Sequence, residues 1–150
     1  AEVAQKMVRL RNYGASYKYY HTDPGTNSRL DTQQAAVLLE KLPYLSEWNR
    51  QRLQLALLYD SELAPLVSKG IIPMQNQSDE GHVYHLYVVK ITEDSSISRQ
   101  DLQQKFIEAG IQTGIHYPIP CHLQPAFANL GYQMGDFPHA EALAKQILSL

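Results

Sequence analysis

Residues 82–91, HVYHLYVVKI, are the stretch that decides the fold class of this chain. Their β-branched and aromatic side chains favour a strand. A second short strand is expected at 71–74 (IIPM), and the polar segment QNQSDEG at 75–81 is expected to turn between the two. The stretch IQTGIHYP at 111–118 is a third strand candidate, and it ends at a proline. The sequence therefore predicts a small sheet built from neighbouring segments.

Helical patterns accompany these strands. In SISRQDLQQKFIEAG, Ser98 is the expected N-cap and Gly110 the expected stop. Residues 139–150, HAEALAKQILSL, are expected to close the chain as an amphipathic helix. The order from residue 70 onward is β-β-α-β-α. The predicted fold class is α+β, with a small antiparallel or mixed sheet of about three strands covered by helices.

Two long helices are expected to precede this sheet. Asp31 is a plausible N-cap for the first, and residues 44–66 carry a broad apolar stripe that predicts the second. Residues 1–11 show helical spacing as well. The connection at 12–30 is rich in glycine, proline and tyrosine, and we expect it to be irregular and to make contacts, because a connection of this length is usually functional.

Composition excludes several classes of protein. Net charge is −2, and the basic residues are scattered, so neither nucleic acid nor an anionic membrane is an expected partner. Hydrophobic residues make up 44% of the 150 residues, which suits a globular domain with a core. No segment has the apolar length of a membrane span or the pattern of a signal peptide. The single cysteine cannot form an intramolecular disulfide, which suits a reducing compartment. A cytoplasmic protein is expected.

Residue spacings give little support for a self-contained catalytic site. His82 and His85 would point to opposite faces of a strand, and no zinc-type ligand spacing occurs, so no metal site is expected. Cys121 lies beside His122, but neighbours in sequence rarely align as nucleophile and base. No serine lies in a GxSxG turn, and no glycine-rich phosphate loop is present.

Two segments suggest ligand binding. GTNSRLDTQQAA, residues 25–36, presents amide and guanidinium donors before a helix, where a phosphate could bind; an ordinary asparagine turn explains it equally well. TGIHYPIPCHLQPAF, residues 113–127, is stiffened by prolines and carries His116 and Tyr117. That segment suits ligand recognition, and it suits a packed corner as well.

Taken together and in order, several stretches resemble the DegT/StrS family of pyridoxal-phosphate-dependent nucleotide-sugar aminotransferases. They span nearly the whole chain with family-like spacing: RNYG (11–14), YKYYH (17–21), GTNSRLDTQQAAVL (25–38), LSEWNRQR (45–52), VYHLYVV (83–89), GIQTGIHYPIPCHLQPAF (110–127), LGY (130–132) and GDFPHAEALAKQILSL (135–150).

The resemblance implies the C-terminal small domain of a fold type I, aspartate-aminotransferase-like enzyme. Residues 1–30 would be the tail of a large domain with a loop close to the ligands, residues 31–66 connecting helices, and residues 67–150 the small α+β domain. The lysine that holds the cofactor as a Schiff base would lie before residue 1, because none of the chain's lysines has a similar context. We therefore expect no catalytic residue in this chain, no activity from it alone, and no covalently bound pyridoxal phosphate.

The resemblance also implies roles for residues that are present. Asn27 resembles the asparagine that reaches across a dimer interface to the partner's cofactor phosphate. Arg11 resembles a basic residue near the nucleotide phosphates, and His116 and Tyr117 resemble the pair that faces the sugar and diphosphate. Nearby residues with less support are Arg29, Tyr19 and His21. The full-length homodimer would transfer an amino group from glutamate to a keto-sugar nucleotide.

A stand-alone, non-catalytic binding or interaction module derived from the same small domain is the alternative. The length of the encoding reading frame separates the two hypotheses, because only the first requires a large domain upstream.

Overall fold

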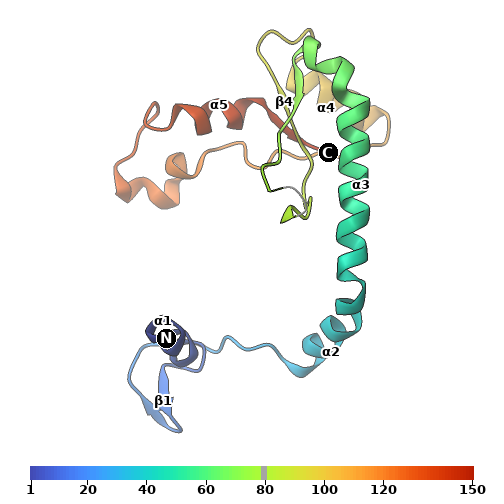
Figure 1. Ribbon diagram of the computed structural model, residues 1–150. Helices are drawn as coiled ribbons and strands as arrows, with labels where there is room; N and C mark the ends of the chain where they lie inside the picture. The colour runs from blue at the N-terminus through green and yellow to red at the C-terminus, as the bar shows by residue number, and fades with distance from the viewer. Residues whose placement is uncertain (79–80) are drawn as a thin grey trace. The chain divides into compact units, whose positions relative to one another are not determined.

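The computed structural model describes residues 1–78 and 81–150, so part of the polar turn expected at 75–81 lies outside the described residues. The chain forms two compact units, Ala1–Ser46 and Glu47–Leu150. Figure 1 shows their elements coloured along the sequence. The α-helices are α1 (Glu2–Leu10), α2 (Thr32–Lys41), α3 (Leu45–Leu63), α4 (Arg99–Glu108) and α5 (Pro138–Gln146). The strands are β1 (Ala15–Tyr17), β2 (Tyr20–His21), β3 (Ile71–Pro73), β4 (Val88–Ile91) and β5 (Ile147–Ser149), and the described 3-10 helices are η1 (Leu42–Tyr44), η2 (Ala64–Lys69), η4 (Cys121–Leu123) and η5 (Pro125–Leu130).

Helix ends lie where the capping signals place them. The Asp31 side chain accepts from the Gln34 N–H at the start of α2, and Ser98 accepts from the Asp101 N–H at the start of α4. Gly110 follows α4 with a φ of +74°, a left-handed conformation that glycine adopts without a steric penalty. These local predictions are confirmed. Every helix among the described residues is too short or too polar to cross a membrane.

The connection at 12–30 is more regular than its composition predicts. β1 and β2 pair as a short antiparallel hairpin, with the rings of Tyr17 and Tyr20 stacked 4.7 Å apart. Turn-forming residues surround these strands closely, so no run of alternating side chains reveals them in the sequence. The expectation of an irregular segment is therefore wrong for residues 15–21.

Unit Glu47–Leu150 contains a three-stranded antiparallel sheet in the order β3-β4-β5. Ile72 of β3 pairs with Lys90, and Val89 of β4 pairs with Leu148 of β5. The predicted α+β class and the small sheet are confirmed, but the third strand is not the expected one. β5 comes from the end of the chain, where residues 139–150 had predicted only helix.

The strand prediction at 111–118 is wrong. Gly114 makes an isolated antiparallel bridge with Ser149, and Pro118 cannot donate to a ladder. The prediction at 82–91 holds only for Val88–Ile91, where β3 and β5 supply partners. Before that, Tyr84 adopts a φ of +46°, which interrupts an extended backbone.

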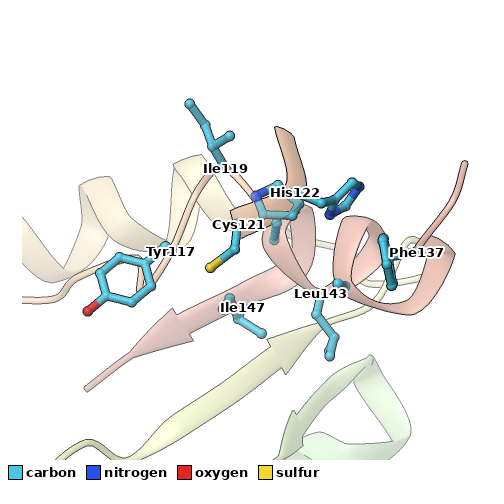
Figure 2. A pocket seen from close by; sticks show the side chains of 10 residues that line it. Tyr117, Ile119, Cys121, His122, Phe137, Leu143 and Ile147 are labelled. Carbon is cyan, nitrogen blue, oxygen red and sulfur yellow. The ribbon is translucent and has the colours of Figure 1, made fainter. Parts of the chain in front are cut away.

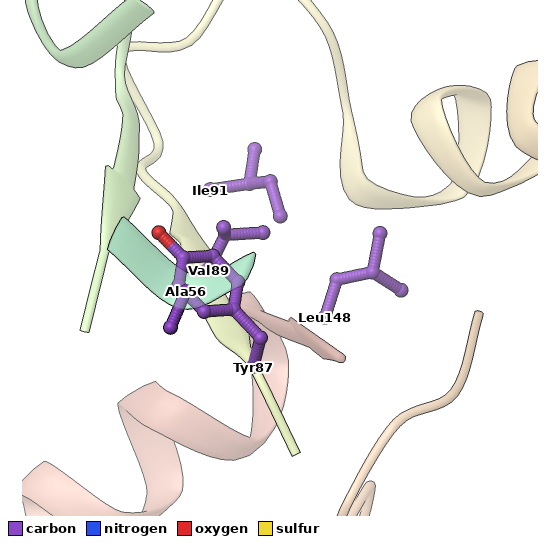
Figure 3. Packing of buried hydrophobic residues seen from close by; sticks show 5 residues of the cluster. All are labelled: Ala56, Tyr87, Val89, Ile91 and Leu148. Carbon is purple, nitrogen blue, oxygen red and sulfur yellow. The ribbon is translucent and has the colours of Figure 1, made fainter. Parts of the chain in front are cut away.

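A small apolar core forms between this sheet and α3 (Figure 3). Leu148 and Val89 are the two largest fully buried side chains, and Ala56 of α3 packs in the same cluster with Tyr87 and Ile91. Burial of such side chains is the dominant favourable contribution to folding. Strand β5 is therefore a core element as well as an edge of the sheet.

Leu148→Ala should lower the free energy of unfolding by about 2–5 kcal/mol, because it removes a large side chain and leaves a cavity. Urea unfolding followed by circular dichroism measures this change. Leu130→Ala is the matched control, since Leu130 is 58% exposed and its truncation leaves no cavity. Equal losses for the two variants would contradict the assigned core.

Candidate functional site

Asn27 lies on a segment that is held by its backbone. It pairs with Asn12 in an isolated antiparallel bridge, and the flanking amides of Thr26 and Ser28 donate to the carbonyls of Leu10 and Arg11, each at 2.9 Å. Its side-chain amide is exposed and has no hydrogen-bond partner within residues 1–78 and 81–150. Backbone hydrogen bonds thus fix the position of Asn27, and its side-chain amide remains available to a ligand.

Two glycines permit this close return of the chain. A Cβ on Gly25 would collide with the backbone of Gly14 and with the carbonyl oxygen of Leu10. Gly14 itself has a φ of +73°, and a Cβ there would collide with the backbone of Asp23. A close backbone contact of this kind explains why glycine occupies both positions.

Arg11 is brought next to Asn27 by the same pairing. Its carbonyl accepts from the Ser28 N–H, and its exposed guanidinium has no hydrogen bond or ion pair in the described part of the chain. The weaker candidates differ. Arg29 donates to Asn12 Oδ1, and His21 Nδ1 lies 2.8 Å from the carbonyl oxygen of Tyr13, so both have structural partners.

Asp23 adds a nearby ion pair that steadies the segment. Arg9 Nε lies 3.0 Å from its carboxylate, and this hydrogen bond, with a second from Thr22, lowers the pKa of Asp23. The carboxylate is therefore ionised at neutral pH and already paired. It would not repel an anion as strongly as a free carboxylate would.

His116 and Tyr117 lie together in the unit Glu47–Leu150. Their rings form an edge-to-face pair with centroids 5.7 Å apart, and the peptide bond between them is cis. Tyr117 is 69% exposed. The His116 ring lies over Gly114, and its Nδ1 is 3.0 Å from Ser149 Oγ. Neither Gly114 nor Ser149 was a candidate site residue, because the sequence predicts a strand at Gly114 and a helix at Ser149.

A pocket of about 420 Å³ opens beside Tyr117 (Figure 2). Its lining is mostly apolar and comes from residues 117–122 and from the segment 137–147. Figure 2 shows the Cys121 sulfur and the His122 ring directed to different sides of the loop. The His122 ring contacts the Phe137 ring in a tilted arrangement, with centroids 4.7 Å apart, on the side away from Cys121.

Glu141 anchors the loop behind this pocket. The Gly135 N–H donates to both carboxylate oxygens at 2.8 and 3.0 Å, and His122 Nε2 lies 3.0 Å from Oε1. Burial alone would raise the pKa of Glu141, but the hydrogen bonds from Gly135, His122 and Phe137 outweigh it and lower the pKa. The sequence does not predict this role of Glu141, because the residue fits the polar face of the amphipathic helix expected at 139–150.

This arrangement offers binding groups rather than a nucleophile with its base. Among the described residues, no group of three or more His, Cys, Asp or Glu side chains could hold a metal ion. The free groups are an amide, a guanidinium, an imidazole nitrogen and a phenol, which bind anions and hydroxyls.

Comparisons with known proteins give these groups a context. The model of the DegT/DnrJ/EryC1/StrS aminotransferase family matches residues 1–150, and the chain belongs to this family. The chain is 44% identical to the erythromycin biosynthesis sensory transduction protein EryC1 of Saccharopolyspora erythraea, over 99% of its own length and 38% of the relative's. It is 42% identical to a dTDP-3-amino-3,4,6-trideoxy-alpha-D-glucose transaminase of Streptomyces venezuelae, with the same coverage. The chain thus spans well under half of these curated relatives.

Solved structures agree with this assignment. S. venezuelae DesV, in complex with a ketimine intermediate, has a TM-score of 0.86 at 43% identity and covers 99% of this chain and 38% of its own. NtdA of Bacillus subtilis with bound cofactor PMP has a TM-score of 0.81 at 36% identity, over 100% of this chain and 35% of its own. The predicted family and fold are confirmed.

Glu141→Gln should destabilise the protein most at neutral pH. A carboxylate with a lowered pKa contributes stability above its ordinary pKa of 4.5 and loses that contribution as pH falls through the lowered value. Urea unfolding of wild type and variant, from neutral pH to about pH 3, follows the difference. Glu93→Gln, at an exposed carboxylate, is the control. A difference that does not change with pH would contradict the proposed anchoring by an ionised Glu141.

Proposed function

We propose that this chain is the C-terminal part of a pyridoxal-phosphate-dependent aminotransferase, which transfers an amino group from glutamate to a keto-sugar carried on a nucleoside diphosphate. The family match over residues 1–150 carries the proposal. Relatives whose names state a reaction are sugar aminotransferases, and three of them are named for dTDP-linked sugars. A cytoplasmic location fits such a biosynthetic role.

Asn27 is the residue proposed to meet the cofactor. A phosphate requires donors that are not already used, and the Asn27 amide is exposed, without a partner among the described residues, and fixed through its backbone. These properties fit a phosphate-binding role toward the cofactor of a second subunit in a homodimer. When bound, pyridoxal phosphate would supply the electron sink for amino-group transfer.

Arg11, His116 and Tyr117 are proposed to bind the nucleotide sugar. The Arg11 guanidinium has no ion pair in the described part of the chain and would neutralise phosphate charge. His116 Nε2 and the Tyr117 hydroxyl have no hydrogen-bond partner among the described residues and can donate to diphosphate or sugar oxygens. None of these groups forms or breaks a covalent bond in the proposed reaction. In the proposed reaction, this chain binds and orients the nucleotide sugar.

The lysine that carries the chemistry would lie upstream in the full-length protein. The full-length protein, supplied with pyridoxal phosphate, glutamate and a dTDP- or UDP-linked keto-sugar, should therefore release 2-oxoglutarate and an aminated nucleotide sugar, which mass spectrometry detects. The 150-residue chain alone should release neither. Absence of amination by the full-length protein with every keto-sugar nucleotide, despite bound cofactor, would favour a non-catalytic binding module.

Asn27→Ala in the full-length protein should weaken cofactor retention by roughly 1–3 kcal/mol, because a phosphate would lose a hydrogen-bond donor. Equilibrium dialysis of pyridoxal phosphate measures the change. Asn129→Ala is the control, since Asn129 is another exposed asparagine, in η5. Unchanged affinity for the cofactor in the Asn27 variant would rule out the phosphate role.

A further inference from the structure

Ser149 is a buried polar residue near the end of the chain. It is only 3% exposed and lies on β5, where it pairs with Val88 of β4. On its other side it exchanges two backbone hydrogen bonds with Gly114, at 3.0 and 2.7 Å. Strand pairing on both sides fixes the position of its side chain.

The hydroxyl of Ser149 meets the ring of His116. Oγ lies 3.0 Å from Nδ1, across 33 residues of sequence. The ring lies directly over Gly114, because a Cβ at that glycine would stand 2.6 Å from the ring carbon Cε1. No side chain at position 114 competes for this space, so the hydroxyl and the glycine together define where the ring sits.

Hydrogen-bond satisfaction selects one tautomer of this ring. A serine hydroxyl has one hydrogen to donate, and within the described residues Nδ1 is the sole hydrogen-bond partner of Ser149 Oγ. If Nδ1–H donated to Oγ, the buried hydroxyl hydrogen would have no acceptor, which is costly. If the hydroxyl donates to Nδ1, the hydrogen is used, and the neutral ring must carry its own proton on Nε2.

We propose that Ser149 is a positioning residue that holds His116 with Nε2–H directed toward the ligand. The inference rests on the proposed function, in which His116 binds the nucleotide sugar. An Nε2–H is a donor, and phosphate oxygens accept, so this tautomer suits the diphosphate group. The opposite tautomer would present a lone pair to an anion. Ser149 thereby sets the polarity of the binding group without touching the ligand.

Nitrogen NMR of the His116 ring in the full-length protein, recorded in alkaline buffer, tests the positioning directly. Wild type should show the Nε2–H tautomer. Ser149→Ala should mix the two tautomers, and Ser149→Thr, which keeps the hydroxyl, should restore the wild-type signal. Thr113→Val is the matched control, since it removes a neighbouring buried hydroxyl that has no hydrogen-bond partner among the described residues.

A second variant keeps the test decisive if Ser149→Ala does not fold. Gly114→Ala keeps the hydroxyl but places a methyl group against the ring, so it should also mix the tautomers. A wild-type tautomer in a folded Ser149→Ala chain, or in a folded Gly114→Ala chain if the serine variant fails to fold, would overturn the inference.

Kinetics of the full-length enzyme separate this inference from the proposed function. Ser149→Ala should raise KM for the nucleotide sugar by about 2- to 10-fold with little change in kcat, as expected for one misplaced hydrogen bond. His116→Ala should raise KM at least as much. If His116→Ala leaves KM unchanged while Ser149→Ala mixes the tautomers, the binding role of His116 fails and the positioning by Ser149 stands.

Discussion

Pairing of β5 with β4 is the interaction on which the larger unit depends. It places Leu148 opposite Val89, and these are the two largest fully buried side chains. The same pairing carries Ser149 to Gly114, and through them it fixes the His116 ring. A strand of three residues thus links the core to the proposed binding group. Loss of that strand would cost stability and disorder the imidazole together.

In the smaller unit, backbone hydrogen bonds hold the segment that carries Asn27. Its long connection returns to the end of α1 through amide-to-carbonyl bonds, and two glycines allow the chains to approach. Because the backbone supplies the hydrogen bonds, the side chains of Arg11 and Asn27 are not consumed by structure. Both units therefore keep donors free for a ligand, one by backbone pairing and the other by a buried hydroxyl that satisfies only one ring nitrogen.

Local features of the fold could be predicted from sequence. Asp31 and Ser98 cap helices because capping depends on the next three residues. The β-branched side chains in Val88–Ile91 favour a strand, and β3 and β5 supply its partners. β5 could not be predicted, since residues 147–149 continue a helical pattern and become strand only because β4 and Gly114 offer partners.

The four proposed binding residues of the candidate site came from the resemblance to the family. The family match supports that resemblance as a whole and does not test the four residues one by one. Ser149 and Glu141 were invisible in the sequence because their roles arise from contacts with residues 33 and 19 positions away. Periodicity in a short window carries no information about such pairs. Residues that position a binding group are harder to predict than the group itself.

Determining the structure of the full-length protein with pyridoxamine phosphate and a nucleotide sugar bound would test most directly whether this chain supplies binding groups to a sugar aminotransferase. The expected result is an Asn27 amide within hydrogen-bond distance of the cofactor phosphate in the other subunit, with His116 Nε2 donating to the diphosphate of the nucleotide sugar. Ligands bound remotely from both residues would contradict the central claim.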